Sequence, residues 1–198
     1  MEDNMQKEIV NEIKYYQMYL SEIISDFCIN ESICDFFDED KNKYNQYGIC
    51  LGNISEALNY RQHMLCYLLF HYDKDSKSIP RFLNRIKDTK IFREVDKDKK
   101  LKQLEEEMTQ LLEEASNDIQ SLKEYRYDVY AHWNKNVFNT EWQQNFKNEH
   151  PFDYGKIIEL CTQCYNLLGD MLNLFGEKSF SKALINKKHL DAFISQLK

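Results

Sequence analysis

Residues 101–122 read LKQLEEEMTQLLEEASNDIQSL, and this stretch decides the fold class. Apolar side chains recur in it at steps of three and four, which places them on one face of an α-helix. This stripe consists of Leu101, Leu104, Met108, Leu111, Ala115, Ile119 and Leu122. We expect the glutamates on the opposite side to face solvent, namely Glu105, Glu106, Glu113 and Glu114. The helix should begin near Lys97 and end close to Ala131 or Trp133, before the asparagine-rich residues 134–139.

The residues before this helix show the same periodicity. A first helix is predicted from about Asp3 into the low thirties, followed by a polar turn at Asp38–Asn45. Its buried face comprises Ile9, Ile13, Tyr16, Leu20, Ile23 and Phe27. A second helix is predicted from about Tyr44 to Phe70. Its inward residues are expected to be Ile54, Leu58, Leu65, Leu68 and Leu69.

Three shorter or later helices complete the prediction. Ser78 and Pro80 are typical of the start of a short helix that buries Phe82, Leu83 and Ile86. Another helix should span about Asp153–Phe175 and stop at Gly176, and a short one is expected at Lys187–Leu197. The sequence therefore predicts an all-α bundle of five to six helices in one domain, residues 1–198.

Composition excludes several other classes of protein. Five glycines and two prolines in 198 residues are too few for the turns of a β-protein. No segment reaches the ~18 to 20 consecutive apolar residues of a membrane span, and the first residues are charged rather than apolar. We therefore expect a cytoplasmic protein that does not enter a membrane.

The net charge of −7 argues against a protein that coats nucleic acid by bulk charge. The segment Arg81–Lys102 is the exception, because it contains nine basic and four acidic residues. The local charge is thus +5, which leaves −12 for the remainder. A solvated helix face and an anion-binding arm are both compatible with this segment.

Six cysteines lie within predicted helices: Cys28, Cys34, Cys50, Cys66, Cys161 and Cys164. The pair Cys161 and Cys164 forms a CxxC, but no second CxxC or CxxH accompanies it. Packing of reduced thiols is the favoured interpretation, and metal or redox chemistry is the alternative. His63, His71, His150 and His189 show no metal-ligand spacing. We therefore expect neither a metal nor a cofactor.

Arg126 interrupts the apolar stripe where the spacing calls for an apolar side chain. An unpaired guanidinium in a dry core costs several kcal/mol, so Arg126 needs an anion, a carboxylate partner or a wet cleft. A structural ion pair with Asp128 or with a glutamate of a neighbouring helix is one interpretation. A functional site that binds an anion is the other.

His132 follows six residues later, near Asp128, Asn134 and Lys135. On an ideal helix, six residues leave Arg126 and His132 about 120° apart around the axis. They converge only if the helix unwinds at its end or if a second copy of the chain supplies the partner. The spacing favours a shared, symmetric site, although His132 alone could simply cap its helix.

The motif Arg126-x5-His132 matches the Arg-x4–6-His signature of the HEPN superfamily of small helical ribonucleases. Its surroundings, YRYDVYAHWNKN at residues 125–136, resemble the branch found in bacterial abortive-infection (phage-exclusion) proteins. Upstream, residues 54–87 are also similar, with a helix, an aspartate-bearing loop and a Ser-Ile-Pro helix. The resemblance covers about residues 45–175.

This resemblance implies a metal-independent endoribonuclease that acts as a toxin or phage-defence effector, controlled by an antitoxin or another defence protein. Arg126 and His132 would be catalytic, supported by Asp128, Asn134 and Lys135, in a composite site across a homodimer. Tyr127 departs from the family pattern, which has a small polar residue there. The alternative is a non-catalytic HEPN-like module that binds a protein partner or a nucleotide.

Overall fold

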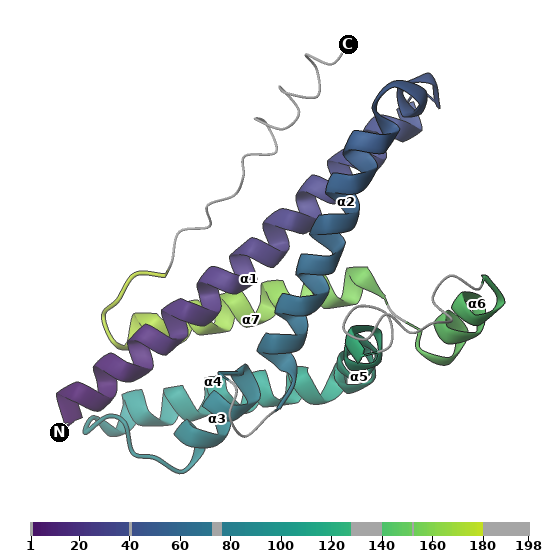
Figure 1. Cartoon of the computed structure of the whole chain (residues 1–198). Coiled ribbons are helices and arrows are strands. Elements are labelled where there is room, and N and C mark those ends of the chain that lie inside the picture. The colour runs from purple at the N-terminus through teal and green to yellow at the C-terminus, as the bar shows by residue number, and fades with distance from the viewer. Residues whose placement is uncertain (1, 40, 73–76, 128–139, 152, 180–198) are drawn as a thin grey trace.

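The computed structural model describes residues 2–39, 41–72, 77–127, 140–151 and 153–179 (Figure 1). Within these ranges the regular secondary structure is helical throughout, with seven α-helices and no strand, which confirms the all-α fold class. None of the helices in the described ranges combines the length and the apolar character needed to cross a bilayer.

Helices α1 (Glu2–Glu39) and α2 (Lys41–Phe70) form a long antiparallel hairpin (Figure 1). The chain reverses within the predicted turn at Asp38–Asn45 (Figure 1), but the turn is shorter than predicted, because α1 continues to Glu39 and α2 begins at Lys41. The inward assignment is wrong for Ile54 and Leu68, which are 44 % and 47 % exposed. Among the described residues, the far end of the hairpin has a small apolar cluster of its own, formed by Ile33, Phe36 and Leu51.

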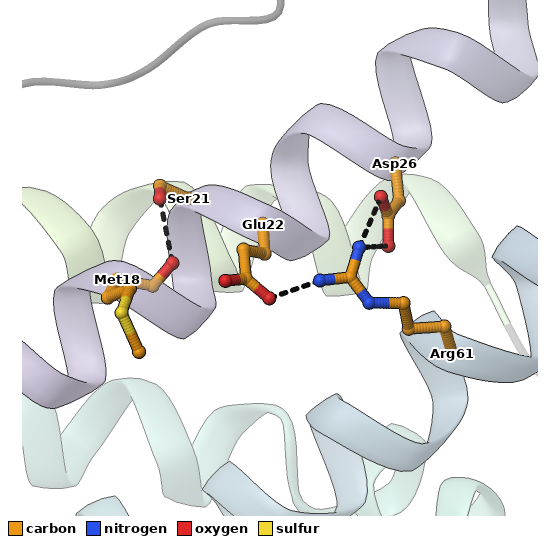
Figure 2. Close-up of polar contacts among 5 residues, drawn as sticks. All are labelled: Met18, Ser21, Glu22, Asp26 and Arg61. Atoms are coloured by element: carbon orange, nitrogen blue, oxygen red, sulfur yellow. Dashed lines mark hydrogen bonds and ion pairs between the residues drawn. The ribbon is translucent and has the colours of Figure 1, made fainter.

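An ion-pair cluster joins the two helices of the hairpin (Figure 2). One terminal nitrogen of Arg61 lies 2.9 Å from both carboxylate oxygens of Asp26, and the other bonds Glu22. The side chain of Asp26 is only 4 % exposed. Burial, more than any other influence, raises the pKa of Asp26, and the charge of Arg61 partly opposes that rise. This pair supplies a fixed polar contact where α1 and α2 leave the main core.

Helix α3 (Ile79–Lys87) follows Ser78 and carries the predicted buried residues Phe82, Leu83 and Ile86. The connector to the next helix is held against the protein rather than extended into solvent. Ile91 and Phe92 are buried, and their backbone N–H groups donate to the carboxylate of Asp98 at 3.0 and 3.2 Å. The N-terminal turn of the following helix is thereby fixed.

The predicted long fourth helix is two helices, α4 (Val95–Glu114) and α5 (Ser116–Glu124). Ala115 separates them, and Figure 1 shows α5 turning away from the axis of α4. Most of the predicted stripe is nevertheless confirmed, since Leu101, Met108 and Leu122 are at most 2 % exposed. Neither proline nor glycine marks the break, so the apolar pattern alone did not predict it.

Glu105 was expected to face solvent, but it is 4 % exposed. Its carboxylate accepts a hydrogen bond from the hydroxyl of Thr109, one turn later, at 3.0 Å. This local bond supplies a polar partner for a carboxylate that has left water, which a buried charge requires. Glu106, Glu113 and Glu114 are exposed as predicted.

Helix α7 (Tyr154–Leu174) packs against α1 and α4 at the centre of the molecule. Asp153 caps it by accepting from the backbone N–H of Lys156, and Gly176, at a φ of 75°, ends it as predicted. Cys161 and Cys164 are fully buried on α7, and burial raises the pKa of Cys164 to about 12. Both thiols pack in the core.

Helix α6 (Thr140–Glu149) was not predicted, and it lies at the edge of the molecule (Figure 1). Its buried residue, Phe146, contacts Tyr125 edge-on with ring centroids 5.0 Å apart. The division at Ala115 and the presence of α6 explain why the structure has more helices than expected. The short helix predicted at Lys187–Leu197 lies outside the described residues.

Candidate functional site

Residues 125–127 form a π-helical turn at the end of α5, and this turn faces α2. Three consecutive side chains of an α-helix spread over about 200° around its axis, so they do not normally contact one neighbour together. Here Tyr125 contacts His63, whereas Arg126 and Tyr127 both contact Tyr67. Such wider turns occur often at functional sites. The regular α-helical winding of the chain is thus lost at Arg126, the residue that interrupts the apolar stripe.

Arg126 lies against two aromatic rings. Its guanidinium carbon is 4.4 Å from the ring centroid of Tyr67 and 5.2 Å from that of Tyr127. Both distances fall within the ~6 Å range of cation–π attraction. The Nε atom of Arg126 is buried without a hydrogen-bond partner in the described structure.

Within the described ranges, no carboxylate pairs with Arg126. The predicted ion pair with a glutamate of a neighbouring helix is therefore not found among these residues. Arg61 and Arg85 differ from Arg126, because carboxylates of α1 bind both of their guanidinium groups.

His63 contacts Tyr125, the residue that precedes Arg126 in the chain, and is 2 % exposed. Its Nδ1 lies 2.8 Å from the carbonyl oxygen of Asn59, which can only accept, so Nδ1 carries the proton in the neutral ring. The Nε2 atom can then accept from the hydroxyl of Tyr154, at 3.2 Å. Burial lowers the pKa of His63, although the bond to Asn59 partly offsets this effect. Through these contacts His63 connects α2 with Tyr154 of α7 and with Tyr125.

The sequence offered a signal for this part of the site that was not used. His63, Tyr67 and His71 are spaced by four residues, which places them on one face of α2. The rings of Tyr67 and His71 stack, with centroids 4.7 Å apart and an interplanar angle of 20°. Histidine and tyrosine side chains repeated on one side of a helix predict a partly buried surface that packs against another element of the protein.

Of the residues predicted for the site, Arg126 lies within the described part of the chain. The predicted catalytic partner His132 and the supporting residues Asp128, Asn134 and Lys135 lie outside it. Their roles remain predictions from the sequence. Tyr127, which departs from the family pattern, is 37 % exposed and contacts both Arg126 and Tyr67.

The basic segment Arg81–Lys102 spans α3, the anchored connector and the start of α4. Arg85 pairs with Glu12 of α1, and Lys97 lies 3.0 Å from Glu94. These contacts favour the interpretation as a solvated helix face. Binding of RNA by this segment remains an untested alternative.

The all-α fold, and the position of Arg126 directly after α5, fit the class of small helical HEPN proteins that the motif indicated. A family model described as AbiU2, of the HEPN type, matches residues 32–193 and so covers most of the chain. The chain therefore belongs to the AbiU2 family of HEPN proteins, the abortive-infection branch. No curated protein and no solved structure matches the chain.

Proposed function

We propose that this protein is a metal-independent endoribonuclease that acts in the cytoplasm as a toxin or phage-defence effector. The observation that supports this most strongly is Arg126, whose guanidinium lies on aromatic rings and is not neutralised by any carboxylate in the described ranges. A planar, permanently charged fork binds two oxygens of a phosphate group, and RNA presents one at every linkage. Membership of the AbiU2 family supports the link to abortive infection.

The proposed reaction uses the 2′-hydroxyl of RNA as the nucleophile. His132 removes the proton from this hydroxyl or donates one to the leaving 5′-oxygen, since an imidazole titrates near neutral pH. Arg126 stabilises the charge that develops on the phosphoryl oxygens. Asp128 orients one of these side chains, and Asn134 and Lys135 contact the RNA backbone nearby.

The site is proposed to be shared by two copies of the chain. On an ideal helix, Arg126 and His132 point about 120° apart, so one chain does not direct both at a single phosphate without unwinding. The π-helical turn at 125–127 interrupts the regular α-helical winding at Arg126 itself. A two-fold axis near the end of α5 would place the arginine of one copy beside the histidine of the other.

The direct test is cleavage of single-stranded RNA by purified protein in EDTA. The wild type should cleave, and His132→Ala should lower the rate by about 10² to 10⁴, the usual contribution of a general acid or base. Arg126→Lys should be nearly as harmful, because lysine keeps the charge but loses the fork. As matched controls, Arg85→Lys and His150→Ala make the same changes away from the motif and should keep the activity.

Two outcomes would contradict the proposal. If wild type and His132→Ala degrade a broad RNA panel equally slowly, and neither is toxic on overexpression, the protein is a non-catalytic module. It would then bind a protein partner or a nucleotide at the same arginine. If Arg126→Lys unfolds the protein, the arginine is a structural residue and its assignment to the site is wrong.

A further inference from the structure

We infer that the rings of Tyr67 and Tyr127 form an aromatic clamp that positions the Arg126 guanidinium for a phosphate group. This inference rests on the proposed function, because it concerns the same arginine. Tyr67 is assigned as the positioning residue and Tyr127 as the second wall of the clamp. The clamp gives a role to Tyr127, which departs from the family pattern.

The contacts of Tyr67 suit a fixed wall. The residue is 9 % exposed, and its ring stacks on His71 and meets the edge of Tyr127, with centroids 6.3 Å apart. Neighbours on several sides restrict its rotation, so the face that Arg126 contacts is in place before any ligand arrives. Preorganised groups of this kind stabilise charge without reorganising during a reaction.

A ring and a carboxylate hold an arginine in different ways. A carboxylate occupies two N–H donors and neutralises the charge, whereas an aromatic ring attracts the cation through its face and leaves the donors free. Arg61 shows the first way, with Asp26 and Glu22 on its fork (Figure 2). Arg126 shows the second way, with Tyr67 and Tyr127.

The consequence concerns anion binding. An arginine already paired with a carboxylate must give up that partner, or share its donors, before it can bind a phosphate. An arginine held by rings keeps its terminal N–H groups and its full positive charge for the incoming phosphate. The clamp therefore favours tight and oriented binding of a single phosphodiester.

The test compares Tyr67→Leu, Tyr67→Phe and Tyr165→Leu. Tyr165 is a matched control because it is an equally buried tyrosine, 5 % exposed, on α7. Tyr67→Leu should lower kcat/KM for RNA cleavage by about 2- to 30-fold, the factor that corresponds to a cation–π contact. Tyr67→Phe, which keeps the ring, should restore most of this loss, and Tyr165→Leu should cleave at the wild-type rate. Circular dichroism should first confirm equal folded fractions.

Two further readouts separate positioning from stability. Added to Arg126→Ala, the change Tyr67→Leu should cost nothing more, because no cation then remains for the ring to hold. The affinity for a fluorescein-labelled RNA strand with 2′-deoxy substitutions, which cannot be cleaved, should weaken in Tyr67→Leu. It should not weaken in Tyr165→Leu. Equal losses in Tyr67→Leu and Tyr165→Leu, or equal losses in Tyr67→Leu and Tyr67→Phe, would overturn the clamp.

Failure of the proposed function is distinguishable from failure of the clamp. NMR of ¹⁵N-labelled protein reports the ring-current shift of the Arg126 Nε–H directly, without any cleavage. Tyr67→Leu should reduce this shift to the contribution of Tyr127, and Tyr165→Leu should leave it unchanged. If the wild type cleaves no RNA but this shift responds as expected, the clamp stands and the ribonuclease proposal fails. If the shift does not respond, the clamp is wrong whatever the activity.

Discussion

His63 is buried against Asn59, Tyr125 and Tyr154, and burial lowers the pKa of its imidazole. In the unfolded chain the pKa returns to about 6.5, so the unfolded state binds a proton more readily. The contribution of His63 to the free energy of unfolding is therefore fully present above about pH 6.5. It is lost as the pH falls toward the lowered pKa that His63 has in the folded protein. Acidification should loosen the junction of α2, α5 and α7.

Replacement of His63 by glutamine should reduce this pH dependence. The measurement is the free energy of unfolding in urea at about pH 7.5 and about pH 5.5, on either side of the ordinary histidine pKa. His63→Gln should be less stable than the wild type at the higher pH but should lose less stability on acidification. His150→Gln, which makes the same change directly after α6, serves as the control. Parallel slopes in wild type and His63→Gln would show that His63 does not titrate as described.

Single residues also show what the sequence could and could not predict. Arg126 was identified because a charged side chain breaks an apolar stripe, and this signal needs no tertiary information. The rings that hold it were missed, because Tyr67 and Tyr127 are 60 residues apart and each resembles an ordinary aromatic position. The spacing of His63, Tyr67 and His71 marks one face of α2, but it does not say which element packs there.

At the level of helices, the ion pair in Figure 2 joins α1 and α2. Arg61→Met would leave Asp26 buried without its cation. Because the arginine itself is 47 % exposed and water can partly replace it, we expect a loss of about 1 to 3 kcal/mol in unfolding free energy. Asp26→Asn in the same chain should recover part of this loss, since it removes the stranded charge.

The loss of stability in Arg61→Met should depend on pH. Burial already raises the pKa of Asp26, and loss of Arg61 removes the charge that opposes this rise. The folded protein would then take up a proton on Asp26 more readily than the unfolded chain does. The penalty of Arg61→Met should therefore shrink as the pH is lowered through the raised pKa. A penalty that is constant with pH, in urea titrations of both proteins, would argue against a stranded carboxylate.

Helix boundaries were predictable where side-chain chemistry marks them. Ser78 with Pro80 marked the start of α3, and Gly176 marked the end of α7. The break at Ala115 has no such mark, because it depends on how α4 and α5 pack rather than on local preference. The burial of Glu105 was missed for the same reason, since the periodicity does not show that Thr109 supplies a partner.

For the molecule as a whole, the proposed shared site requires two copies of the chain. We expect a homodimer in analytical ultracentrifugation at tens of micromolar, with the end of α5 in the interface. Because Tyr127 lies at this end and is 37 % exposed, Tyr127→Glu should weaken the dimer by placing a charge in the contact. A monomer at this concentration, or a dimer that places the two Arg126 residues on opposite outer faces, would contradict the shared site.

The chemistry of the cut RNA ends tests the central claim most directly. If the 2′-hydroxyl is the nucleophile, mass spectrometry of RNA cut in EDTA should find 2′,3′-cyclic phosphates or their hydrolysis products at the new 3′ ends. The new 5′ ends should carry hydroxyl groups, and a 2′-deoxy substitution at the cut site should block cleavage there. New ends with a 3′-hydroxyl and a 5′-phosphate, formed by wild type and by His132→Ala alike, would contradict the account.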